Sequence, residues 1–286
     1  MCVWVKFETL MNPAESYPWG AFRPTGSAAL LRMPVRAGLS VGFLHKFIKL
    51  IWLRSLGRGP VDIAYHGLKL RVIPDRNMTD HKLLLRSGLR DQTELNFIKR
   101  HVPTKGVFLD IGANIGYYSL SAAKLGFARI IAIEPNPLLV PRLRFNAQAN
   151  NLDERLRLVS VAVSDHEGEM FLHSPGDLGS GSISHDAVTA GDVAVTVKPL
   201  ANILAAEAVE QVDAFKIDVE GHEDRALLPW LRALPDDKLP IAGIIEFVHQ
   251  RHWHDDLIAY LRERGYQIGL KTRSNIIVVR GAAGLS

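Results

Sequence analysis

The chain has 286 residues, of which 47% are hydrophobic and 22% are charged, and these fractions are ordinary for a globular protein. Its single cysteine, Cys2, excludes an internal disulfide framework and a cysteine-based zinc site, so a reducing, cytoplasmic setting is expected. The formal net charge is only +4. A local surplus of Lys and Arg over residues 32–58, where no acid occurs, predicts an anionic partner or a solvated face rather than a nucleic-acid-binding domain.

Residues 1–59 are predicted to form an N-terminal extension, followed by one domain over residues 60–286. The first thirty or so residues are rich in Pro, Gly and Ser without clear periodicity, so poor order is expected there. Residues 40–54, SVGFLHKFIKLIWLR, predict a basic amphipathic helix. Such a helix either packs on the domain, which is the commoner case, or lies at the inner membrane face with its lysines toward anionic lipid.

Two local patterns follow in the chain. Residues 61–74 alternate around His66-Gly67 and predict a β-hairpin. Residues 91–103 predict a helix, with Asp91 as N-cap and Glu94 completing a capping box.

From residue 107 onward, strand and helix patterns alternate with short connections. Strands are expected at 107–111, 129–133, 156–163, 193–197, 212–217, 241–247, 266–270 and 275–279, and helices at 115–125, 137–150, 220–234 and 255–264. Repeated strand–helix units predict an α/β fold with a mostly parallel sheet and helices on both faces. The last two strands are joined by only a few residues, so they should pair antiparallel.

The first of these strands ends in the stretch DIGANIG, and the ligand class depends on this loop. In an open α/β sheet, ligands bind at the carboxyl ends of the strands. Gly112 and Gly116 would let the backbone approach a ligand, but the spacing fails the Gly-x-Gly-x-x-Gly pattern of dinucleotide binders. Asp110 would repel a pyrophosphate and could accept from an ammonium group. These features favour S-adenosyl-L-methionine (SAM), a nucleoside with a zwitterionic amino-acid tail.

Acidic residues also follow the next two strands. Glu134 is placed to bind the two ribose hydroxyls of a nucleoside, although an isolated acid at this point would more often be an exposed turn residue. Asp165, in the stretch SDHEG, is placed near the expected adenine position. A turn acid before Gly168 explains Asp165 nearly as well.

A fourth cluster, FKIDVEGHE, surrounds a strand end and a helix start. Asp218 follows the strand directly and should face the ligand crevice, so it is the first candidate for a general base, with His222 second and Glu220 third. Acids at a helix start also serve as caps, which is the alternative for Glu220. Glu246 and His249 lie at and just after the end of the expected strand 241–247 and are further candidates. A divalent ion on Asp218 and Glu220 is chemically reasonable, but no ligand spacing demands one, so no metal site is predicted.

Taken together, FLDIGANIGYYS and FKIDVEGHE resemble the FkbM-type SAM-dependent methyltransferases, and the resemblance covers about residues 60–280. It implies a class I methyltransferase fold, a Rossmann-like seven-stranded sheet with an antiparallel last strand. It also implies O-methylation of a hydroxyl on a sugar, glycolipid or related natural product, with a small-molecule or glycan acceptor and no nucleic acid. The residues implied to carry SAM lie in the matching motifs: Asp110, Gly112, Ala113, Asn114, Gly116, Glu134, Pro135 and Asp165.

One departure and two alternatives accompany this interpretation. The family often has Thr-Leu-Asp where this chain has Leu200-Ala201-Asn202, which puts the acceptor in doubt. A non-catalytic SAM-binding or membrane-docked partner protein is the main alternative, and a nicotinamide-dependent oxidoreductase is the other. The Gly- and Ser-rich segment 174–184 is expected to form a loop near the acceptor.

Overall fold

The computed structural model describes residues 13–26, 28–29, 51–57, 59–85, 88–103, 105–173, 178–184, 186, 189 and 191–281. Most of the helix expected at 40–54 lies outside these residues. Its described end, residues 51–56, is helical, and Trp52 is fully buried with its indole N–H donating to the carbonyl of Ala28 at 2.8 Å. Within the described ranges, no helix combines the length and the apolar character needed to cross a bilayer.

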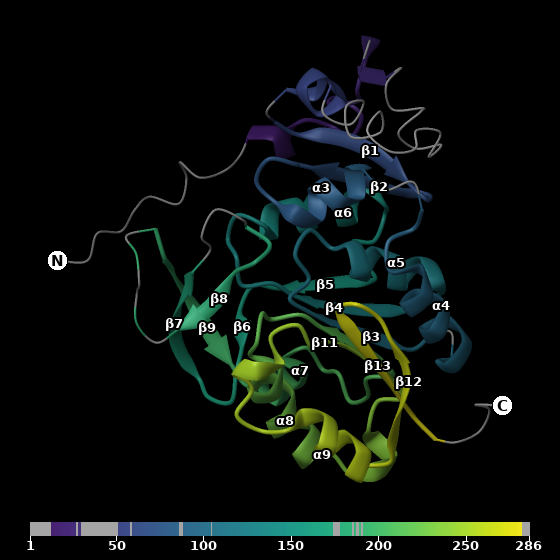
Figure 1. The fold of residues 1–286 in the computed structure, drawn as a ribbon, viewed down its shortest axis with the longest axis vertical. Helices are drawn as coiled ribbons and strands as arrows, with labels where there is room; N and C mark the ends of the chain where they lie inside the picture. The colour runs from purple at the N-terminus through teal and green to yellow at the C-terminus, as the bar shows by residue number, and fades with distance from the viewer. Residues whose placement is uncertain are drawn as a thin grey trace.

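The central sheet has seven strands in the order β12-β13-β11-β10-β3-β4-β5 (Figure 1). Their bounds are β3 Val107–Ile111, β4 Arg129–Ile133, β5 Leu156–Val159, β10 Ala214–Ile217, β11 Ala242–Glu246, β12 Tyr266–Lys271 and β13 Asn275–Arg280. Pairing from β5 through β11 is parallel, whereas β13 inserts between β11 and β12 and is antiparallel to both. The expected mostly parallel sheet with an antiparallel last strand is therefore confirmed.

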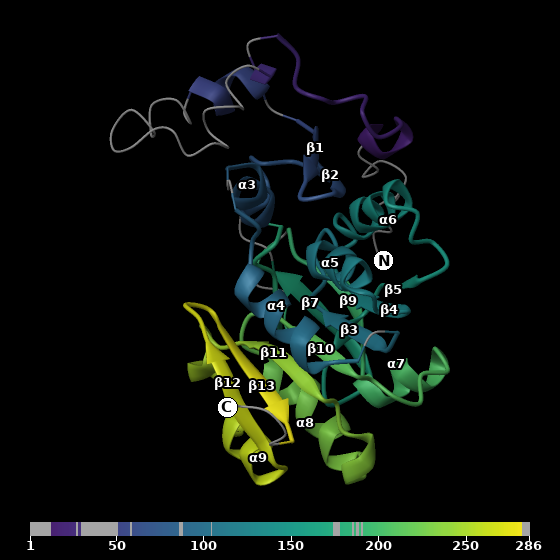
Figure 2. The ribbon, with the colours of Figure 1, turned by 90° about the vertical axis from the view of Figure 1, so that its right-hand side faces the viewer.

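Helices cover both faces of this sheet (Figure 2). One layer contains α4 Gln92–His101, α5 Tyr117–Leu125 and α6 Val140–Ala149, and the other contains α7 Leu200–Ala206, α8 Glu223–Ala233 and α9 Leu257–Glu263. Successive side chains of a strand point to opposite faces, so each strand supplies both layers. In β3, Phe108 packs in the core on the α5 side and Leu109 packs in the core on the α8 side. This alternation places Asp110 on the α5 side.

A second, smaller sheet was not expected. The predicted strand 156–163 divides into β5 and β6, Ala162–Val163, and β6 joins β7 Gly168–His173, β8 Ser182–Ser184 and β9 Val193–Lys198 in the order β6-β9-β7-β8. This sheet stands beside the central one, on the left in Figure 1. It has its own small apolar core, which includes Met170, Leu172 and Val197.

The predicted capping box of α4 is wrong. Asp91 has a left-handed backbone (φ 51°) and its side chain makes no capping hydrogen bond, but instead lies 3.1 Å from Nε of Arg90. Glu94 is buried and accepts from the side-chain amide of Asn275 at 3.4 Å. Tertiary contacts thus replace the local caps that the sequence pattern indicated.

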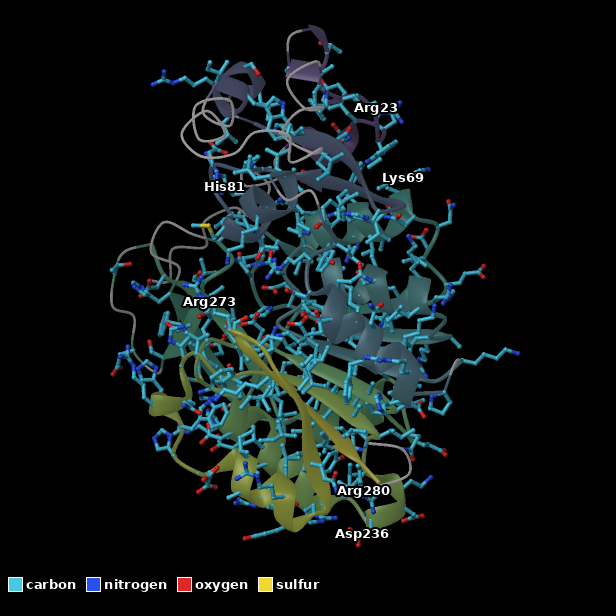
Figure 3. All side chains as sticks on the ribbon, turned by 45° about the vertical axis from the view of Figure 1, so that its right-hand side comes forward. Arg23, Lys69, His81, Asp236, Arg273 and Arg280 are labelled. Carbon is cyan, nitrogen blue, oxygen red and sulfur yellow. The ribbon has the colours of Figure 1, made fainter. Side chains whose placement is uncertain are left out.

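The expected hairpin is confirmed as β1 Val61–Tyr65 and β2 Leu68–Val72, followed by α3 Met78–Leu85. A fully buried pair, Asp62 and Arg71, ties the segment 13–26 to it: Asp62 accepts from the backbone N–H of Gly20, and Arg71 donates to carbonyls of that segment. Figure 3 shows Arg23 and Lys69 near each other at this end of the molecule. Both side chains lie over the ring of Trp19. This part of the N-terminal extension therefore packs on the hairpin.

Candidate active site

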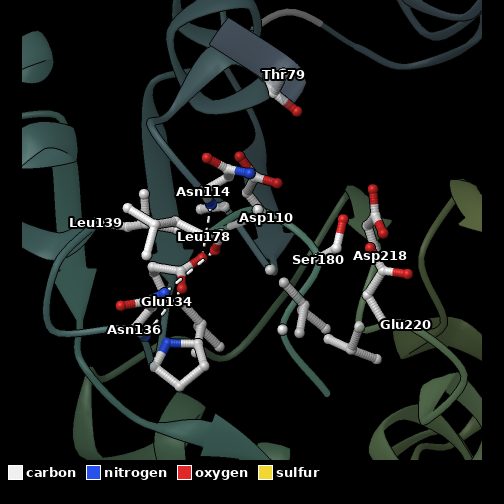
Figure 4. Close-up of a pocket in the computed structure, with 18 of the residues that line it drawn as sticks. Thr79, Asp110, Asn114, Glu134, Asn136, Leu139, Leu178, Ser180, Asp218 and Glu220 are labelled. Carbon is white, nitrogen blue, oxygen red and sulfur yellow. Dashed lines mark hydrogen bonds between the residues drawn. The ribbon is translucent and has the colours of Figure 1, made fainter. Parts of the chain in front are cut away.

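A cavity of about 160 Å³ lies at the carboxyl ends of β3, β4, β10 and β11. Figure 4 shows Asp110 and Asn114 in its middle, Glu134 and Asn136 on one side, and Asp218 and Glu220 on the other. This is the crevice where parallel α/β sheets bind their ligands. The structure therefore brings three of the four acidic motifs of the sequence to one site.

The loop after β3 is shaped by Gly112. Its φ is +76°, and a Cβ atom built on it would stand 1.9 Å from the carbonyl oxygen of Asp218, so glycine is required on both counts. The backbone N–H groups of Gly112 and Ala113 both donate to the carbonyl of Ile133 at 3.0 Å. Ala113 and Asn114 line the cavity, whereas Gly116 lies outside its lining, at the start of α5, against Leu143.

Asp110 is almost fully buried in the cavity wall and accepts a hydrogen bond of 2.5 Å from the hydroxyl of Ser119 on α5. Lys216 occupies the register position beside it on β10 and therefore faces the same helix layer. Burial raises the pKa of Asp110 to about 6, although Ser119 and Lys216 act against this rise. At neutral pH, Asp110 is an anion that can accept from a cationic group.

Glu134 is held by the loops on either side of it. Its two carboxylate oxygens accept from the backbone N–H groups of Asn114 at 2.7 Å and Asn136 at 2.9 Å. Burial raises the pKa of Glu134 to about 7, against the effect of these two hydrogen bonds. Each oxygen keeps a further lone pair, which suits the two hydroxyls of a ribose.

A strap of residues 178–181 crosses the cavity from the smaller sheet and forms part of its wall. The strap is anchored by Leu178, which donates to the carbonyl of Arg76 at 3.0 Å and accepts from the side chain of Asn136 at 3.1 Å. A Cβ atom on Gly179 would stand 2.6 Å from the side-chain amide nitrogen of Asn114, so the strap passes close to the loop after β3. The Gly/Ser-rich loop does lie at the site, but residues 174–177 fall outside the described part.

Three carboxylates gather at the opposite end of the cavity. Oxygens of Asp218, Glu220 and Glu246 lie within 4.8 Å of one another, and Glu220 also lies 3.0 Å from the ring nitrogen Nε2 of His249. Burial raises the pKa of Glu246 to about 9, and the charge of Asp218 adds to the rise. Burial acts in the same sense on Asp218, but the charge of Lys216, 3.4 Å away, the hydrogen bond with Glu246 and the charge of Arg90 together outweigh it and leave the pKa of Asp218 below its usual value. At neutral pH the pair therefore holds one proton, on Glu246. These oxygens are also of the kind that hard divalent cations prefer.

Two residues proposed from the sequence lie away from the cavity lining. Asp165 is half-exposed and lies 2.7 Å from Nδ1 of His166, and this contact lowers the pKa of Asp165 against the opposing effect of burial. His222 is turned to Ser164, with 2.8 Å between Nε2 and the hydroxyl oxygen. Burial lowers the pKa of His222 to about 4, so the ring is neutral at pH 7.

Several lining residues had not been assigned to the site from the sequence: Thr79, Lys82, Arg90, Asn136 and Val161. Asn136 follows Glu134 by only two positions, so the EPNP stretch held a usable signal. The others come from segments that only the tertiary fold brings to the site.

The strand order of the central sheet and a Gly-bearing loop between two buried carboxylates define a class I SAM-dependent methyltransferase fold. The chain belongs to the FkbM methyltransferase domain family, whose model matches residues 110–268. SAM is thus the methyl donor, and the residues of the cavity fit it: Asp110 would accept from the ammonium of its tail, and Glu134 would accept from the ribose hydroxyls.

Curated relatives come from two bacteria. The chain is 31% identical over 116 residues to a ribosomal protein L11 methyltransferase of Thermosipho africanus, covering 37% of this chain and 44% of the relative. It is 29% identical over 155 residues to the protein of that name from Deinococcus radiodurans, covering 51% and 53%. The chain thus spans about half the length of the curated relatives that it matches. A tRNA (uracil-54, C5)-methyltransferase of Pyrococcus abyssi, solved with S-adenosyl-L-homocysteine, aligns with a TM-score of 0.43 at 14% identity over 78% of this chain and 44% of that one.

These relatives correct the acceptor expected from the sequence. Their name refers to a ribosomal protein, which is a macromolecule rather than a small molecule or a glycan. The expectation of a small-molecule or glycan hydroxyl acceptor, with nucleic acid excluded, is therefore wrong. The methyltransferase class and the donor stand.

Proposed function

We propose that this methyltransferase transfers the methyl group of SAM to an amine nitrogen of a protein substrate. The observation that carries the proposal is the cluster of Asp218, Glu220 and Glu246 at the end of the cavity opposite Glu134. Although Glu246 holds a proton, Asp218 keeps its negative charge in this confined, half-buried site, and a cation placed among the three acids is attracted to that charge. An amine arrives from water as an ammonium ion, so the cluster suits it.

Bound SAM would supply a methyl group already activated on a sulfonium, so the chain's task is to position and deprotonate the acceptor. Asp218 is the ionised member of the pair and is the group placed to take a proton from the incoming ammonium. Glu246 holds a proton beside it and keeps the pair from carrying two full charges. Glu220, held by His249, would orient the ammonium from the other side.

The curated relatives support a protein as the substrate, because they are named as methyltransferases of a ribosomal protein. A hydroxyl oxygen, expected from the family resemblance, is the competing acceptor atom. The acidic cluster favours nitrogen because a neutral hydroxyl gains less from the negative charge of Asp218 than a cation does.

The test is transfer of radiolabelled methyl from SAM to two fractions from the cells that make the protein, total ribosomal protein and ribosomal RNA. Acid hydrolysis and chromatography of the labelled protein should show N-methylated amino acids. The Asp218→Asn variant should give a signal reduced by roughly 10²–10⁴-fold. Label found only in RNA or only on oxygen would refute the amine proposal. Cofactor binding with no transfer to either fraction would favour the non-catalytic alternative.

A further inference from the structure

The cavity is lined by three basic residues among those that the structure describes: Lys82, Arg90 and Lys216. Lys216 already has partners within the protein, because its ammonium donates to the carbonyl of Ile217 at 2.8 Å and pairs with Asp218 at 3.4 Å. Lys82 is exposed on α3. Arg90 is the basic group that is both largely buried, with 17% of its side chain exposed, and directed to the cavity wall.

The backbone of Arg90 is fixed by two tyrosines from separate elements. Its N–H donates to the hydroxyl of Tyr65 on β1 at 2.8 Å, and its carbonyl accepts from the hydroxyl of Tyr117 at the start of α5. The Tyr65 hydroxyl also donates to the carbonyl of Gly88 at 2.7 Å. The loop before α4 is therefore pinned at the edge of the cavity, which positions a binding side chain with little loss of conformational entropy on binding.

The guanidinium group of Arg90 is oriented but not saturated. Its Nε donates to Asp91 at 3.1 Å, and its central carbon lies 5.8 Å from the centre of the Tyr117 ring. Among the described residues, no hydrogen-bond partner is found for its two terminal nitrogens. Donors of a charged group in a half-buried site are costly to leave unpaired, and a carboxylate satisfies two of them at once.

The methionine tail of SAM has one ammonium and one carboxylate. Asp110, which is suited to the ammonium, accepts a hydrogen bond from Ser119, and Arg90 lies over the ring of Tyr117. Because Tyr117 and Ser119 both belong to the first turn of α5, the two charged groups lie near the same end of this helix. We propose that Arg90 binds the carboxylate of the methionine tail of SAM through its two terminal nitrogens. This role concerns the donor and does not depend on the identity of the acceptor.

Calorimetric titration with two ligands tests this role. S-adenosyl-L-homocysteine carries the tail, whereas 5′-methylthioadenosine keeps the nucleoside and lacks both charged groups. Arg90→Gln should weaken S-adenosyl-L-homocysteine by roughly 10- to 100-fold, the loss typical of a charged hydrogen-bonded pair. Binding of 5′-methylthioadenosine should change by less than about 2-fold, since no charged pair is involved.

Lys99→Gln is the matched control, because it removes a positive charge from an exposed position on α4 outside the cavity lining, without touching Tyr65 or Tyr117. It should leave the affinity for S-adenosyl-L-homocysteine within about 2-fold of wild type. Equal weakening of both ligands in Arg90→Gln would show a structural role for Arg90 and overturn the proposal, as would unchanged binding of both. The titrations contain no methyl acceptor, so their results do not depend on whether the acceptor is an amine.

Discussion

The carboxylate of Asp218 lies next to that of Glu246 because β10 and β11 run parallel with Ile217 in register with Ile245. Each acid is at or just past the end of its strand, so the two side chains leave neighbouring strands at the same level and on the same face. One carboxyl of such a pair is expected to hold a proton. This juxtaposition makes the stability of the protein depend on pH in a defined direction.

We predict that Glu246→Gln becomes more stable relative to wild type as the pH rises. Burial, aided by the charge of Asp218, raises the pKa of Glu246 from 4.5 to about 9 in the folded protein. The folded state therefore holds a proton that the unfolded chain releases, and the resulting stability is fully present below about pH 4.5 and is lost as the pH rises through about 9. Glutamine keeps the neutral shape and has no proton to lose.

Thermal melts of both proteins from pH 5 to pH 9 measure this difference. The melting temperature of Glu246→Gln should rise steadily, relative to that of wild type, as the pH increases across this range. Glu263→Gln, at an exposed position on α9, is the control and should follow wild type throughout. Parallel curves for Glu246→Gln and wild type would show that Glu246 is ionised in the folded protein.

Asp218→Asn is predicted to impair methyl transfer while sparing donor binding. Loss of the ionised member of the pair removes the proton acceptor, and removal of a general base typically costs about 10²–10⁴-fold in rate. The affinity for S-adenosyl-L-homocysteine should change little, because the proposed donor contacts lie on Asp110, Gly112 and Glu134. Single-turnover rates and calorimetric titration provide the two readouts, and Asp237→Asn, at an exposed acid in the short 3-10 helix Asp236–Lys238, is the control. Full activity of the Asn variant would remove Asp218 from the mechanism.

Glu134 should make donor binding pH-dependent near neutrality. Burial raises the pKa of Glu134 to about 7, so this carboxyl gains its charge as the pH rises from 6 to 8. Hydrogen bonds to a charged group are worth about 1.5–3 kcal/mol, against roughly 0.5–1.5 for neutral ones. The ribose hydroxyls should therefore bind more tightly at pH 8. The loss of affinity in Glu134→Gln, relative to wild type, should be largest at that pH.

Dissociation constants for 5′-methylthioadenosine at pH 6, 7 and 8 isolate this effect, because that ligand keeps the ribose and lacks the tail that meets Asp110. Asp165→Asn is the companion variant: Asp165 was assigned to the donor site from its motif but lies outside the cavity lining. It should bind like wild type at every pH. A gap between Glu134→Gln and wild type that stays constant with pH would contradict the role of the charge.

The sequence was most informative where the chemistry is carried by contiguous residues. The stretch around Asp110 and the stretch around Asp218 each join a buried strand to a polar turn, and both were placed correctly at the carboxyl edge of the sheet. The seven-stranded order with its antiparallel last strand was also predictable, through the family resemblance and the short link between the last two strands.

Features that depend on register or on distant segments were not predictable. The meeting of Asp218 with Glu246 requires the pairing of β10 with β11, which no local pattern encodes. Arg90 reaches the cavity only because hydroxyls of Tyr65 and Tyr117 hold its loop. Asp165 had a suitable motif position, but the chain leaves the central sheet after β5 and pairs β6 with β9, which carries that turn to the smaller sheet.

The last prediction concerns Gly112 and uses Gly265 as its matched control. Both have left-handed backbones, with φ of +76° and +82°, but nothing lies within 4 Å of a Cβ atom on Gly265, whereas one on Gly112 would strike the carbonyl oxygen of Asp218 at 1.9 Å. Gly265→Ala should lower the free energy of unfolding by about 1–2 kcal/mol, the cost of a left-handed alanine. Gly112→Ala adds a backbone clash, so about 2–5 kcal/mol is expected. Urea unfolding measures both, and equal losses would mean that the β3 and β10 loops are not packed against each other as described.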